Sequence, residues 1–346
     1  LTEQRVADIV AAVRQVIALP DPVGRVTKME TRPNGLQIGR KTVPLGVIAI
    51  IYEARPNVTV DAAALCLKSG NVCILRGGKE SIRSNRCAAA LMRGALESVG
   101  LPEDCISLVQ DTSRESANEL MHLNGYVDVL IPRGGAGLIR AVASQASVPV
   151  IRTGEGVCHI YVDSDANLDM AAEILYNAKC SRPSVCNAVE CVLIHEAVAA
   201  EFLQKAVPLL DRKHVELRCD AASLALLGAR ARAAEDADWD AEYDDYILAV
   251  HVVRDLDEAM EFIAAHSTQH SECIVTESYA KAQRFLDEVD AAAVYVNAST
   301  RFTDGGEFGM GAEIGISTQK MHARGPMGLE ELTSYKYIVY GNGQVR

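Results

Sequence analysis

The sequence contains no CxxC pair, no HExxH motif and no disulfide-like spacing among its ten cysteines. It also has no signal-peptide pattern. The paired cysteines of a disulfide-stabilised secreted protein and the histidine pair of a zinc hydrolase are therefore both missing. We expect a reduced, cytoplasmic protein that holds no metal.

Long hydrophobic runs and blocks of basic residues are also absent. The longest apolar run, near residues 47–52, is far shorter than a membrane span. The formal net charge is −12 at pH 7 and no basic cluster stands out, which argues against nucleic acid as a partner. A small anionic substrate stays compatible with this charge if its site is locally basic. With 49% hydrophobic and 23% charged residues, the composition is that of an ordinary soluble globular protein.

The 346 residues are too many for one ordinary core and predict two domains. Apolar residues at helical spacing predict a helix over 2–18, with Thr2 as its N-cap. Asn34-Gly35, between the segments 25–31 and 36–43, predicts a two-stranded arm, because Asn-Gly is the strongest short hairpin signal. An arm with little core of its own often serves an oligomer interface. The first residue is Leu rather than Met, so we also expect a fragment or a processed chain.

Short apolar runs alternate with helical patterns along the rest of the chain. This rhythm predicts parallel sheets covered on both faces, which bind ligands at the carboxyl ends of their strands. The first domain has predicted strands at 47–52, 72–75, 106–109, 127–131 and 148–151, and helices at 58–67, 81–98, 113–121 and 136–146. The second has predicted strands at 159–162, 189–194, 247–252, 273–276 and 292–297, and helices at 167–178, 197–210, 255–265 and 278–289. A glycine-rich segment, 304–316, and a last helix and strand within 328–340 complete the chain.

Cys186 stands in a loop of small and polar residues, 177–188, that leads into an apolar run. Pro183 stops the preceding helix, and Arg182 places a cation four residues from the thiol. A nearby positive charge and backbone N–H groups lower the pKa of a thiol and favour the nucleophilic thiolate. On spacing alone the ordinary interpretation, a small buried hydrophobic residue, stays open.

Two strand ends in the first domain carry glycines and cations directly before a helix. One is Arg76-Gly77-Gly78-Lys79, and the other is Arg133-Gly134-Gly135. Glycines permit close backbone approach, and a helix start offers free N–H groups to a phosphate. Neither segment is a GxGxxG fingerprint or a Walker A loop, so simple turns are the alternative. Two such loops at neighbouring strand ends favour a nucleotide site.

Three further polar segments are candidates for a site. Asn57 is either the N-cap of the helix after strand 47–52 or an amide donor to an oxyanion. His270, within the segment 268–271, either lines a substrate cleft or belongs to a capped turn. Ser299, Thr300 and Arg301 follow the last strand of the second domain, and an arginine among hydroxyls suits a carboxylate or a phosphate.

Longer stretches of the sequence carry a family resemblance. They are Gly46–Asp61, Leu75–Glu80, Leu130–Gly137, Gly156–Asp163, Arg182–Asn187, Val294–Gly309 and Ser317–Tyr335. Through them the chain resembles the aldehyde dehydrogenase superfamily, and within it the γ-glutamyl phosphate reductases (glutamate-5-semialdehyde dehydrogenases). Such long, ordered matches are highly specific and run nearly end to end. The chain departs from the family in lacking a further N-terminal helical segment, and around Met260 and Phe262, where we expect altered packing.

The resemblance implies NADPH-dependent reduction of L-glutamyl 5-phosphate to L-glutamate 5-semialdehyde plus phosphate, in proline biosynthesis. Cys186 would attack the acyl phosphate and form a thioester, while Asn57 and the Cys186 N–H would stabilise the oxyanion. NADPH would then donate hydride. Oxidative relatives use a glutamate to hydrolyse their thioester. Arg152 stands at that position here, with Glu155 as an open alternative.

The resemblance and the loops above also imply binding residues. For the cofactor NADPH/NADP⁺ they are Arg76, Gly77, Gly78, Lys79, Arg133, Gly134, Gly135 and Glu242. Arg76 and Lys79 would face the 2′-phosphate, and Glu242 the nicotinamide ribose. Glu242 lies in the segment 235–245, where seven of eleven residues are acidic and a solvated surface loop is otherwise expected. The substrate ligands would be Arg182 for the departing phosphate, Arg301 with Ser299 and Thr300 for the α-carboxylate, and His270.

The predicted fold is α/β and aldehyde dehydrogenase-like, with two Rossmann-like parallel-sheet domains and a β-hairpin oligomerisation arm. Residues 1–28 and 44–155 would form a cofactor-binding domain, its N-terminal part missing, and residues 156–318 the catalytic domain. Residues 29–43 and 333–346 would form the arm of a homo-oligomer, a dimer or larger. Glutamate 5-kinase is the expected channelling partner. Two alternatives stay open: another thioester-forming acyl reductase of the acyl-CoA type, or a non-enzymatic binding protein that keeps the fold.

Overall fold

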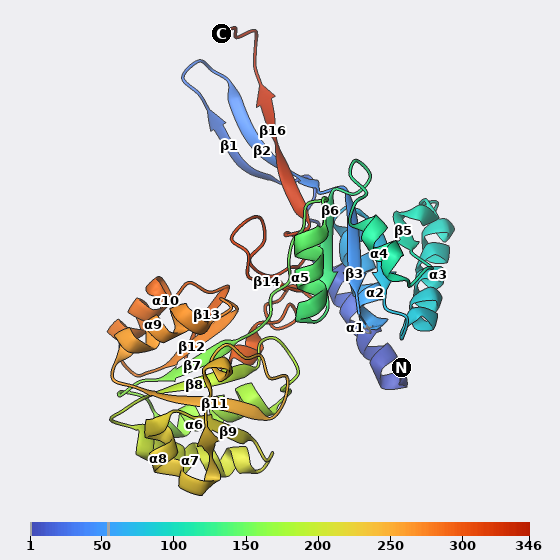
Figure 1. Cartoon of the computed structure of the whole chain (residues 1–346). Helices are drawn as coiled ribbons and strands as arrows, with labels where there is room; N and C mark the ends of the chain where they lie inside the picture. The colour runs from blue at the N-terminus through green and yellow to red at the C-terminus, as the bar shows by residue number, and fades with distance from the viewer. Residues whose placement is uncertain (1, 54–55) are drawn as a thin grey trace. The chain divides into compact units, whose positions relative to one another are not determined.

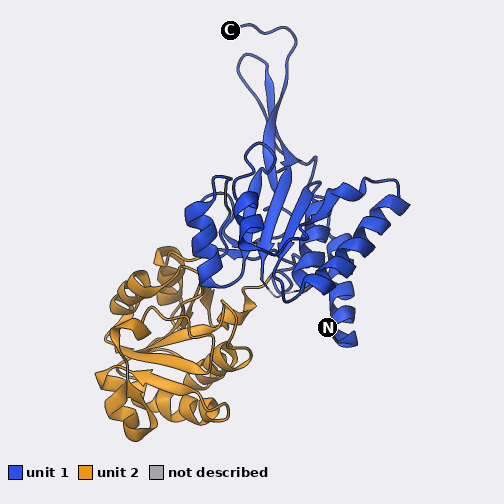
Figure 2. Cartoon of the chain, turned by 45° about the vertical axis from the view of Figure 1, so that its right-hand side comes forward, with its two compact units in different colours: residues 1–153, 305–346 blue, residues 154–304 orange. Residues whose placement is uncertain are grey.

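A computed structural model describes residues 2–53 and 56–346 of the chain, apart from the side chain of Pro56. Ala54 and Arg55, which belong to the first resembling stretch, lie outside the described residues. The chain divides into two compact units, residues 1–153 with 305–346 and residues 154–304 (Figure 2). Each unit has its own sheets and its own hydrophobic core.

The first unit is built around a parallel sheet with the strand order β5-β4-β3-β6 (Figure 1). Its strands are β3 (Val47–Tyr52), β4 (Val72–Gly77), β5 (Ile106–Leu108) and β6 (Val129–Arg133). Its helices are α1 (Glu3–Ala18), α2 (Pro56–Lys68), α3 (Ile82–Ser98), α4 (Arg114–Leu120) and α5 (Ala136–Gln145), with a short 3₁₀ turn at Glu103–Cys105. Strand β3 is buried from Ile48 onward, as a central parallel strand must be. Thr2 caps α1 as predicted, because its side chain accepts the Arg5 N–H.

Three local predictions for the first unit are wrong. Residues 148–151 are assigned to no strand among the described residues, and Val150 makes only an isolated bridge with Leu130, because Pro149 has no N–H to donate. The start of the segment 328–340 is a turn rather than a helix, since Leu329 and Leu332 both point into the core. Helix α2 begins at Pro56, which suits the first helical position, so Asn57 is not its N-cap.

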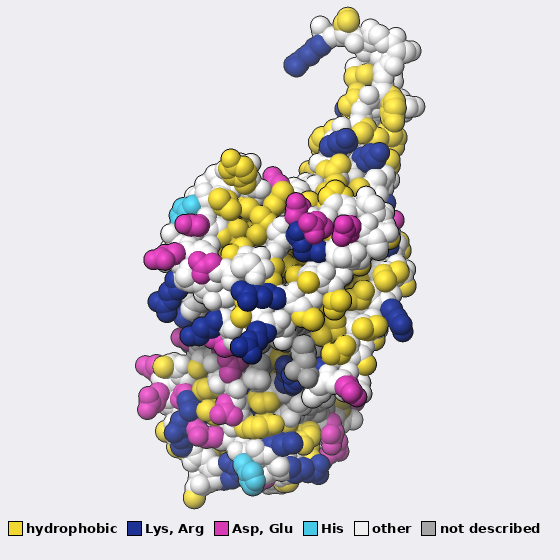
Figure 3. All heavy atoms as spheres, turned by 90° about the vertical axis from the view of Figure 1, so that its right-hand side faces the viewer, with side chains coloured by type: hydrophobic (Ala, Val, Ile, Leu, Met, Phe, Trp, Pro, Cys, Tyr) yellow, Lys and Arg dark blue, Asp and Glu magenta, His cyan; other side chains and the backbone are white. Residues whose placement is uncertain are grey.

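An antiparallel sheet of three strands forms the arm, in the order β1-β2-β16 (Figure 1). The hairpin of β1 (Val26–Thr31) and β2 (Gln37–Pro44) is confirmed, and Gly35 in its turn has a φ of +84°. Strand β16 (Thr333–Tyr340) pairs with β2 along its length. Apolar side chains are exposed on the arm (Figure 3): Val26, Met29, Tyr335, Tyr337, Val339 and Tyr340. The oligomeric role of the arm stays a prediction.

The second unit contains a parallel sheet with the strand order β10-β9-β11-β8-β7-β12-β13 (Figure 1). Its strands are β7 (Cys158–Val162), β8 (Val189–His195), β9 (Glu216–Cys219), β10 (Arg232–Ala233), β11 (Ile247–Val253), β12 (Ser271–Val275) and β13 (Ala293–Val296). Its helices are α6 (Leu168–Cys180), α7 (Ala199–Asp211), α8 (Ala221–Leu227), α9 (Leu256–His266) and α10 (Tyr279–Glu288). Short 3₁₀ turns lie at Gly228–Arg230, Asp236–Asp238 and Thr300–Phe302. The apolar core formed by α6, α7 and the sheet includes Leu175, Phe202 and Val192.

The structure differs from the prediction in the surroundings of two segments. Residues 305–318, assigned to the catalytic domain from sequence, belong to the first unit, because Ile314 packs into its core and β14 (Ile316–Ser317) pairs with β15 (Gly325–Pro326). The acidic segment 235–245 is not only a solvated loop. Asp238 is buried and its carboxylate pairs with Arg218, so part of this charge run is folded around a cation.

No helix in the described part of the chain is long and apolar enough to cross a membrane.

Candidate active site

The loop that carries Cys186 joins the end of α6 to the start of β8. Helix α6 ends at Cys180, with Ser181 as its C-cap, and β8 begins at Val189. Cys186 is partly exposed and in no disulfide. The loop lies at the amino ends of the strands of the second sheet, since it precedes β8 and β8 runs parallel to β7. The predicted nucleophile of this unit therefore lies away from the carboxyl ends of the strands, where the sequence pattern predicts that ligands bind.

Two residues near the start of β7 support the backbone of Cys186. A Cβ atom on Gly156 would lie 1.5 Å from the carbonyl oxygen of Cys186, so only glycine fits there. The Gly156 N–H donates to Glu242 Oε1 at 2.9 Å. The buried thiol of Cys158 donates to the same Cys186 carbonyl oxygen at 3.2 Å. Burial raises the pKa of the Cys158 thiol well above its ordinary value, which keeps it protonated as a donor.

The chain after β13 returns to the Cys186 loop. The Asn187 amide donates to the carbonyl oxygens of Arg301, at 3.2 Å, and Thr303, at 2.9 Å. Thr300 Oγ1 donates to the carbonyl oxygen of Asn187 at 2.7 Å. The Arg301 guanidinium donates in turn to Asn187 Oδ1 and, at 3.1 Å, to Ser181 Oγ. Arg301 is thus held between the two ends of the loop rather than beside the end of β13.

Charges converge at this loop. Burial lowers the pKa of Arg301, and the neighbouring charge of Arg182 lowers it further, while Asp304 and Cys186 act in the opposite direction. Arg301 therefore lies close enough to Arg182 and to Cys186 to interact with each of them electrostatically. A guanidinium held against the loop that carries the thiol provides a place for an anion.

The other predicted substrate ligands of this unit lie in its interior. His270 is fully buried, and its Nδ1 contacts Ser271 Oγ at 2.8 Å and Cys158 Sγ at 3.8 Å. Thr300 is also fully buried, and Ser299 Oγ accepts the Arg301 N–H at 3.3 Å. These side chains brace the Cys186 loop and the segment that returns to it. Their predicted contact with substrate has no support in this geometry.

In the first unit, the predicted cofactor loops meet at the carboxyl edge of the sheet. Glu53 follows β3, and its Oε2 accepts the Gly135 N–H at 2.9 Å at the start of α5. A Cβ on Gly134 would lie 2.6 Å from the same carboxylate oxygen. This helix start is thus bonded to an anionic group of the chain itself. It also lies between β3 and β6, where the strand order changes direction and open α/β sheets bind ligands.

The residues at the end of β4 and directly after it have different surroundings from one another. Gly77 is a packing glycine, because a Cβ there would lie 2.2 Å from the buried Asn85 amide. Gly78 is partly exposed and Lys79 is exposed. The Arg76 guanidinium donates to the carbonyl oxygens of Thr112, at 2.8 Å, and Ser113, at 2.6 Å, so part of its donor capacity is used within the chain.

Arg133 and Asn57 are each fixed by a carboxylate. Arg133 pairs with Glu313 at 3.5 Å in a partly buried contact. Asn57 Nδ2 donates to Asp61 Oδ2 at 2.9 Å, which orients the amide and uses one of its two N–H donors. Burial raises the pKa of Asp61, while Asn57 and Arg133 act against that rise.

Sequence reasoning missed four residues that shape these edges: Glu53, Asp61, Gly156 and Cys158. Each lies inside or at the end of a quoted stretch, so its position was available. Its partner, in three of the four cases, lies at least 28 residues away in the sequence. No group of three or more metal-ligating side chains occurs among the described residues.

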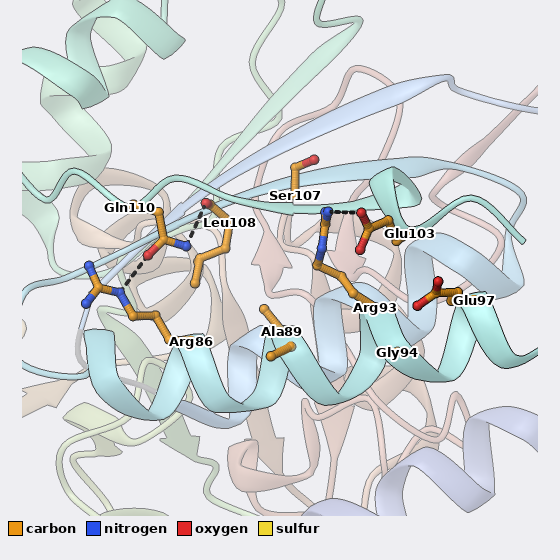
Figure 4. A pocket seen from close by; sticks show the side chains of 10 residues that line it. Arg86, Ala89, Arg93, Gly94, Glu97, Glu103, Ser107, Leu108 and Gln110 are labelled. Carbon is orange, nitrogen blue, oxygen red and sulfur yellow. Dashed lines mark hydrogen bonds and ion pairs between the residues drawn. The ribbon is translucent and has the colours of Figure 1, made fainter.

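A hollow of about 580 Å³ lies between α3 and residues 103–110 of the first unit (Figure 4). Arg86 bonds Gln110 at its rim, and Arg93 pairs with Glu103. It is lined by none of the predicted site residues.

Comparison with known proteins places this geometry in a family. Residues 2–224 match the aldehyde dehydrogenase family. A gamma-glutamyl phosphate reductase of Clostridium perfringens is 60% identical over 346 residues, which is 100% of this chain and 83% of the relative. The chain belongs to the γ-glutamyl phosphate reductases of the aldehyde dehydrogenase family. A second γ-glutamyl phosphate reductase, from Enterococcus faecalis, is 59% identical with the same coverage.

Solved structures agree with this assignment. The crystal structure of the γ-glutamyl phosphate reductase of Thermotoga maritima has a TM-score of 0.97 and 48% identity, and covers 100% of this chain and 83% of that one. An acetylating aldehyde dehydrogenase from Geobacillus thermoglucosidasius, at 18% identity, shares the fold with a TM-score of 0.75 over 97% of this chain and 82% of its own. The family resemblance, the fold class and the prediction of an oxidoreductase are confirmed.

Proposed function

We propose that this chain reduces L-glutamyl 5-phosphate to L-glutamate 5-semialdehyde and inorganic phosphate, with NADPH as reductant and Cys186 as nucleophile. The names of its relatives support the substrate. The observation that carries the proposal is the Arg301 guanidinium, which bonds Ser181 and Asn187 at the two ends of the Cys186 loop. An acyl phosphate suits this arrangement, because its leaving group is an anion that Arg301, with the nearby Arg182, can receive.

In the proposed reaction the Cys186 sulfur attacks the carbonyl carbon of the acyl phosphate. The new C–S bond gives a tetrahedral species whose oxyanion accepts hydrogen bonds from the Cys186 N–H and the Asn57 amide. The C–O bond to phosphate then breaks, inorganic phosphate leaves with the electron pair, and a thioester remains on the chain. Asp61 assists by holding one Asn57 N–H and leaving the other to the oxyanion.

We assign Arg301, together with Arg182, to the phosphate. The sequence predicts that Arg301 binds the α-carboxylate of the substrate. That group lies at the opposite end of the glutamyl chain from the phosphate. The bonds from its guanidinium to Ser181 and Asn187 instead hold it against the nucleophile loop. A fixed guanidinium loses little conformational freedom when it binds an anion.

The carboxyl edge of the first unit's sheet fits a dinucleotide. The Gly135 N–H donates to Glu53 Oε2, and a carboxylate at this helix start supports the proposal that a cofactor phosphate takes its place. Gly134 and Gly135 would hold the pyrophosphate, and Arg76 and Lys79 the 2′-phosphate. Arg133 would support this loop through Glu313, and Glu242 keeps the ribose role implied by the family. When bound, the cofactor supplies the hydride that reduces the thioester carbonyl, after which the C–S bond breaks, the aldehyde leaves and the electron pair returns to the Cys186 sulfur.

The thioester must outlive attack by water for this reaction to succeed. Arg152 stands where oxidative relatives carry a glutamate base, so hydrolysis lacks its catalyst. Glu155, three residues later, is the alternative base in this account. Phosphate, rather than water, should therefore release the acyl group when the reaction runs in reverse.

The test is reduction of NADP⁺ by glutamate 5-semialdehyde, with and without phosphate, for the wild type and Cys186→Ala. We expect turnover that requires phosphate and is lost in the variant. Turnover without phosphate would point to a hydrolytic dehydrogenase and to Glu155 as its base. Turnover that requires coenzyme A instead of phosphate would support the alternative function, that of an acyl-CoA reductase.

A further inference from the structure

A fully buried pair of opposite charges flanks the nucleophile loop. The side chain of Lys179 is 0% exposed and that of Glu190 is 1% exposed, and Nζ lies 2.6 Å from Oε2. Lys179 belongs to the last turn of α6, and Glu190 is the second residue of β8. The loop that carries Cys186, residues 181–188, is what separates the two elements. The pair therefore ties the end of one element to the start of the other.

Stability alone does not account for this pair. Removing two charges from water is costly, and well-packed apolar residues of similar volume often replace a buried ion pair without loss of stability. The cost is visible at Glu190, whose pKa is raised by burial, against the opposing effect of Lys179, while the nearby Glu242 raises it further. What the pair offers in return is a short, directed bond at a fixed place.

Other contacts hold the middle and the two ends of the loop, including the bonds of the Arg301 guanidinium to Ser181 and Asn187. Gly156 packs against the Cys186 carbonyl, and the Asn187 amide is tied to the segment 301–303. None of these contacts joins α6 directly to β8, whose apolar side chains share one core. The bond from Lys179 to Glu190 adds a directed link between the two elements, at the point where α6 ends and the loop begins.

We propose that Lys179 and Glu190 are a positioning pair that sets the geometry of the Cys186 loop. Neither residue is proposed to touch the substrate. The inference deepens the proposed function, on which its kinetic part rests. A shift of about 1 Å in a nucleophile costs on the order of a hundredfold in rate, so even a small relaxation of the loop should be measurable.

The experiment compares two variants with the wild type, Glu190→Gln and the apolar double variant Lys179→Met with Glu190→Leu. Three properties are measured: thermal unfolding, the kinetics of phosphate-dependent NADP⁺ reduction, and the rate at which iodoacetamide alkylates Cys186. Peptide mass spectrometry identifies the alkylated cysteine. We expect the double variant to unfold at the wild-type temperature or above, because its core is apolar.

The kinetic effects should separate chemistry from binding. In both variants kcat and the Cys186 alkylation rate should fall by at least about tenfold, while KM for NADP⁺ and phosphate changes by less than about threefold. A control is Asp163→Asn, which breaks a pair of a buried carboxylate with the partly exposed Lys281, at 2.9 Å. Asp163 follows β7 at the opposite edge of the sheet. Its loss should lower the unfolding temperature and leave kcat and Cys186 alkylation unchanged.

A folded variant with wild-type kcat and wild-type alkylation would overturn the proposal, because the pair would then only support the fold. If the double variant does not fold, Glu190→Gln decides alone, since it keeps the size and an acceptor while removing the charge. The alkylation rate needs no substrate. A wild-type enzyme that fails to oxidise glutamate 5-semialdehyde would refute the proposed function, and the thiol measurement would still decide the role of the pair.

Discussion

The two units are both built on parallel sheets, but their candidate functional residues occupy opposite edges. In the first unit Glu53 and Gly135 follow β3 and β6, and Arg76 is one of the last two residues of β4, at the carboxyl ends of the strands. In the second unit Gly156 precedes β7 and Cys186 precedes β8, at the amino ends. The familiar rule for α/β sheets locates the first set and misplaces the second.

The carboxyl edge of the second sheet does other work. Asp163 follows β7 and binds Lys281 and Thr276, while Asp220 follows β9 and caps α8. These carboxylates stabilise the fold at the sheet edge where the rule for α/β proteins would place a ligand. The comparison shows that the function of a sheet edge must be inferred from the side chains that lie there. It also predicts that substitutions at one edge of this sheet impair activity, whereas those at the other impair stability.

The largest expected effect is that of Gly156→Ala. The new Cβ would collide with the Cys186 carbonyl oxygen, at a nominal 1.5 Å, and would force the nucleophile loop to move. We expect kcat/KM to fall by at least about a hundredfold. The measurement is steady-state NADP⁺ reduction at saturating phosphate, together with a thermal melt.

Gly94→Ala is the matched control, in α3 of the first unit. A Cβ at Gly94 meets nothing within 4 Å, and helix interiors favour alanine. The variant should be stabilised by about 0.5–1 kcal/mol and keep full activity. An equal loss of kcat/KM in the two variants would show that Gly156 has no special role.

The next effect concerns the phosphate. Arg301→Lys keeps the charge but loses the planar group that Ser181 and Asn187 hold in place. We expect KM for phosphate in the reverse reaction to rise by about 10- to 100-fold, and KM for NADP⁺ to stay unchanged. Arg284→Lys, in an exposed pair with Glu288 on α10, is the control. A rise confined to KM for NADP⁺ would contradict the assignment of Arg301.

A smaller effect should appear at the carboxyl edge of the second sheet. Burial alone would raise the pKa of Asp220, but bonds from His251, Ser223 and the Val252 N–H outweigh it and lower the pKa to about 2. The ordinary value is near 3.9, so the charged group contributes about 2 kcal/mol above about pH 4. That stability is lost as the pH falls toward about 2.

Asp220→Asn should therefore unfold more easily than the wild type at neutral pH, with kcat unchanged. The difference between the two proteins in urea should shrink as the pH falls through the range from about 4 to about 2. A constant difference across that range would mean that the carboxylate charge plays no part.

The smallest effect is expected at the cofactor edge. Arg76→Ala and Lys79→Ala should each raise KM for NADPH by about fivefold, because exposed charges contribute modestly, and raise KM for NADH less. Arg76 also bonds two carbonyl oxygens of the chain, whereas Lys79 is exposed, so the second variant isolates the effect of charge. Equal changes for the two cofactors would exclude a role at the 2′-phosphate.

The sequence predicted what depends on neighbours along the chain. The apolar run of β3, the cap on α1 and the Asn34-Gly35 turn were all found, because their causes lie within a few residues. The segment expected to be a strand at 148–151 forms only an isolated bridge, because Pro149 has no N–H to donate. What local pattern cannot supply is a partner that is distant in the sequence.

The candidate site shows the same limit. Cys186 was found from its loop and from family resemblance, and its standing as nucleophile is still a proposal. The hydrogen bond from Arg301 to Asn187 joins residues 114 positions apart in the sequence. No local pattern in either segment predicts this contact. Lys179 and Glu190 looked like ordinary residues of a helix and a strand. Their burial emerges only when both elements pack together.

The most direct test of the central claim is to capture the acyl group on Cys186. Enzyme, glutamate 5-semialdehyde and NADP⁺ are mixed without phosphate and quenched rapidly in acid, and the peptides are analysed by mass spectrometry. The account predicts a glutamyl thioester on the peptide that contains Cys186, and its disappearance when phosphate is added before the quench. Reduction of NADP⁺ with no acyl group on Cys186, or with the acyl group on another residue, would contradict the account.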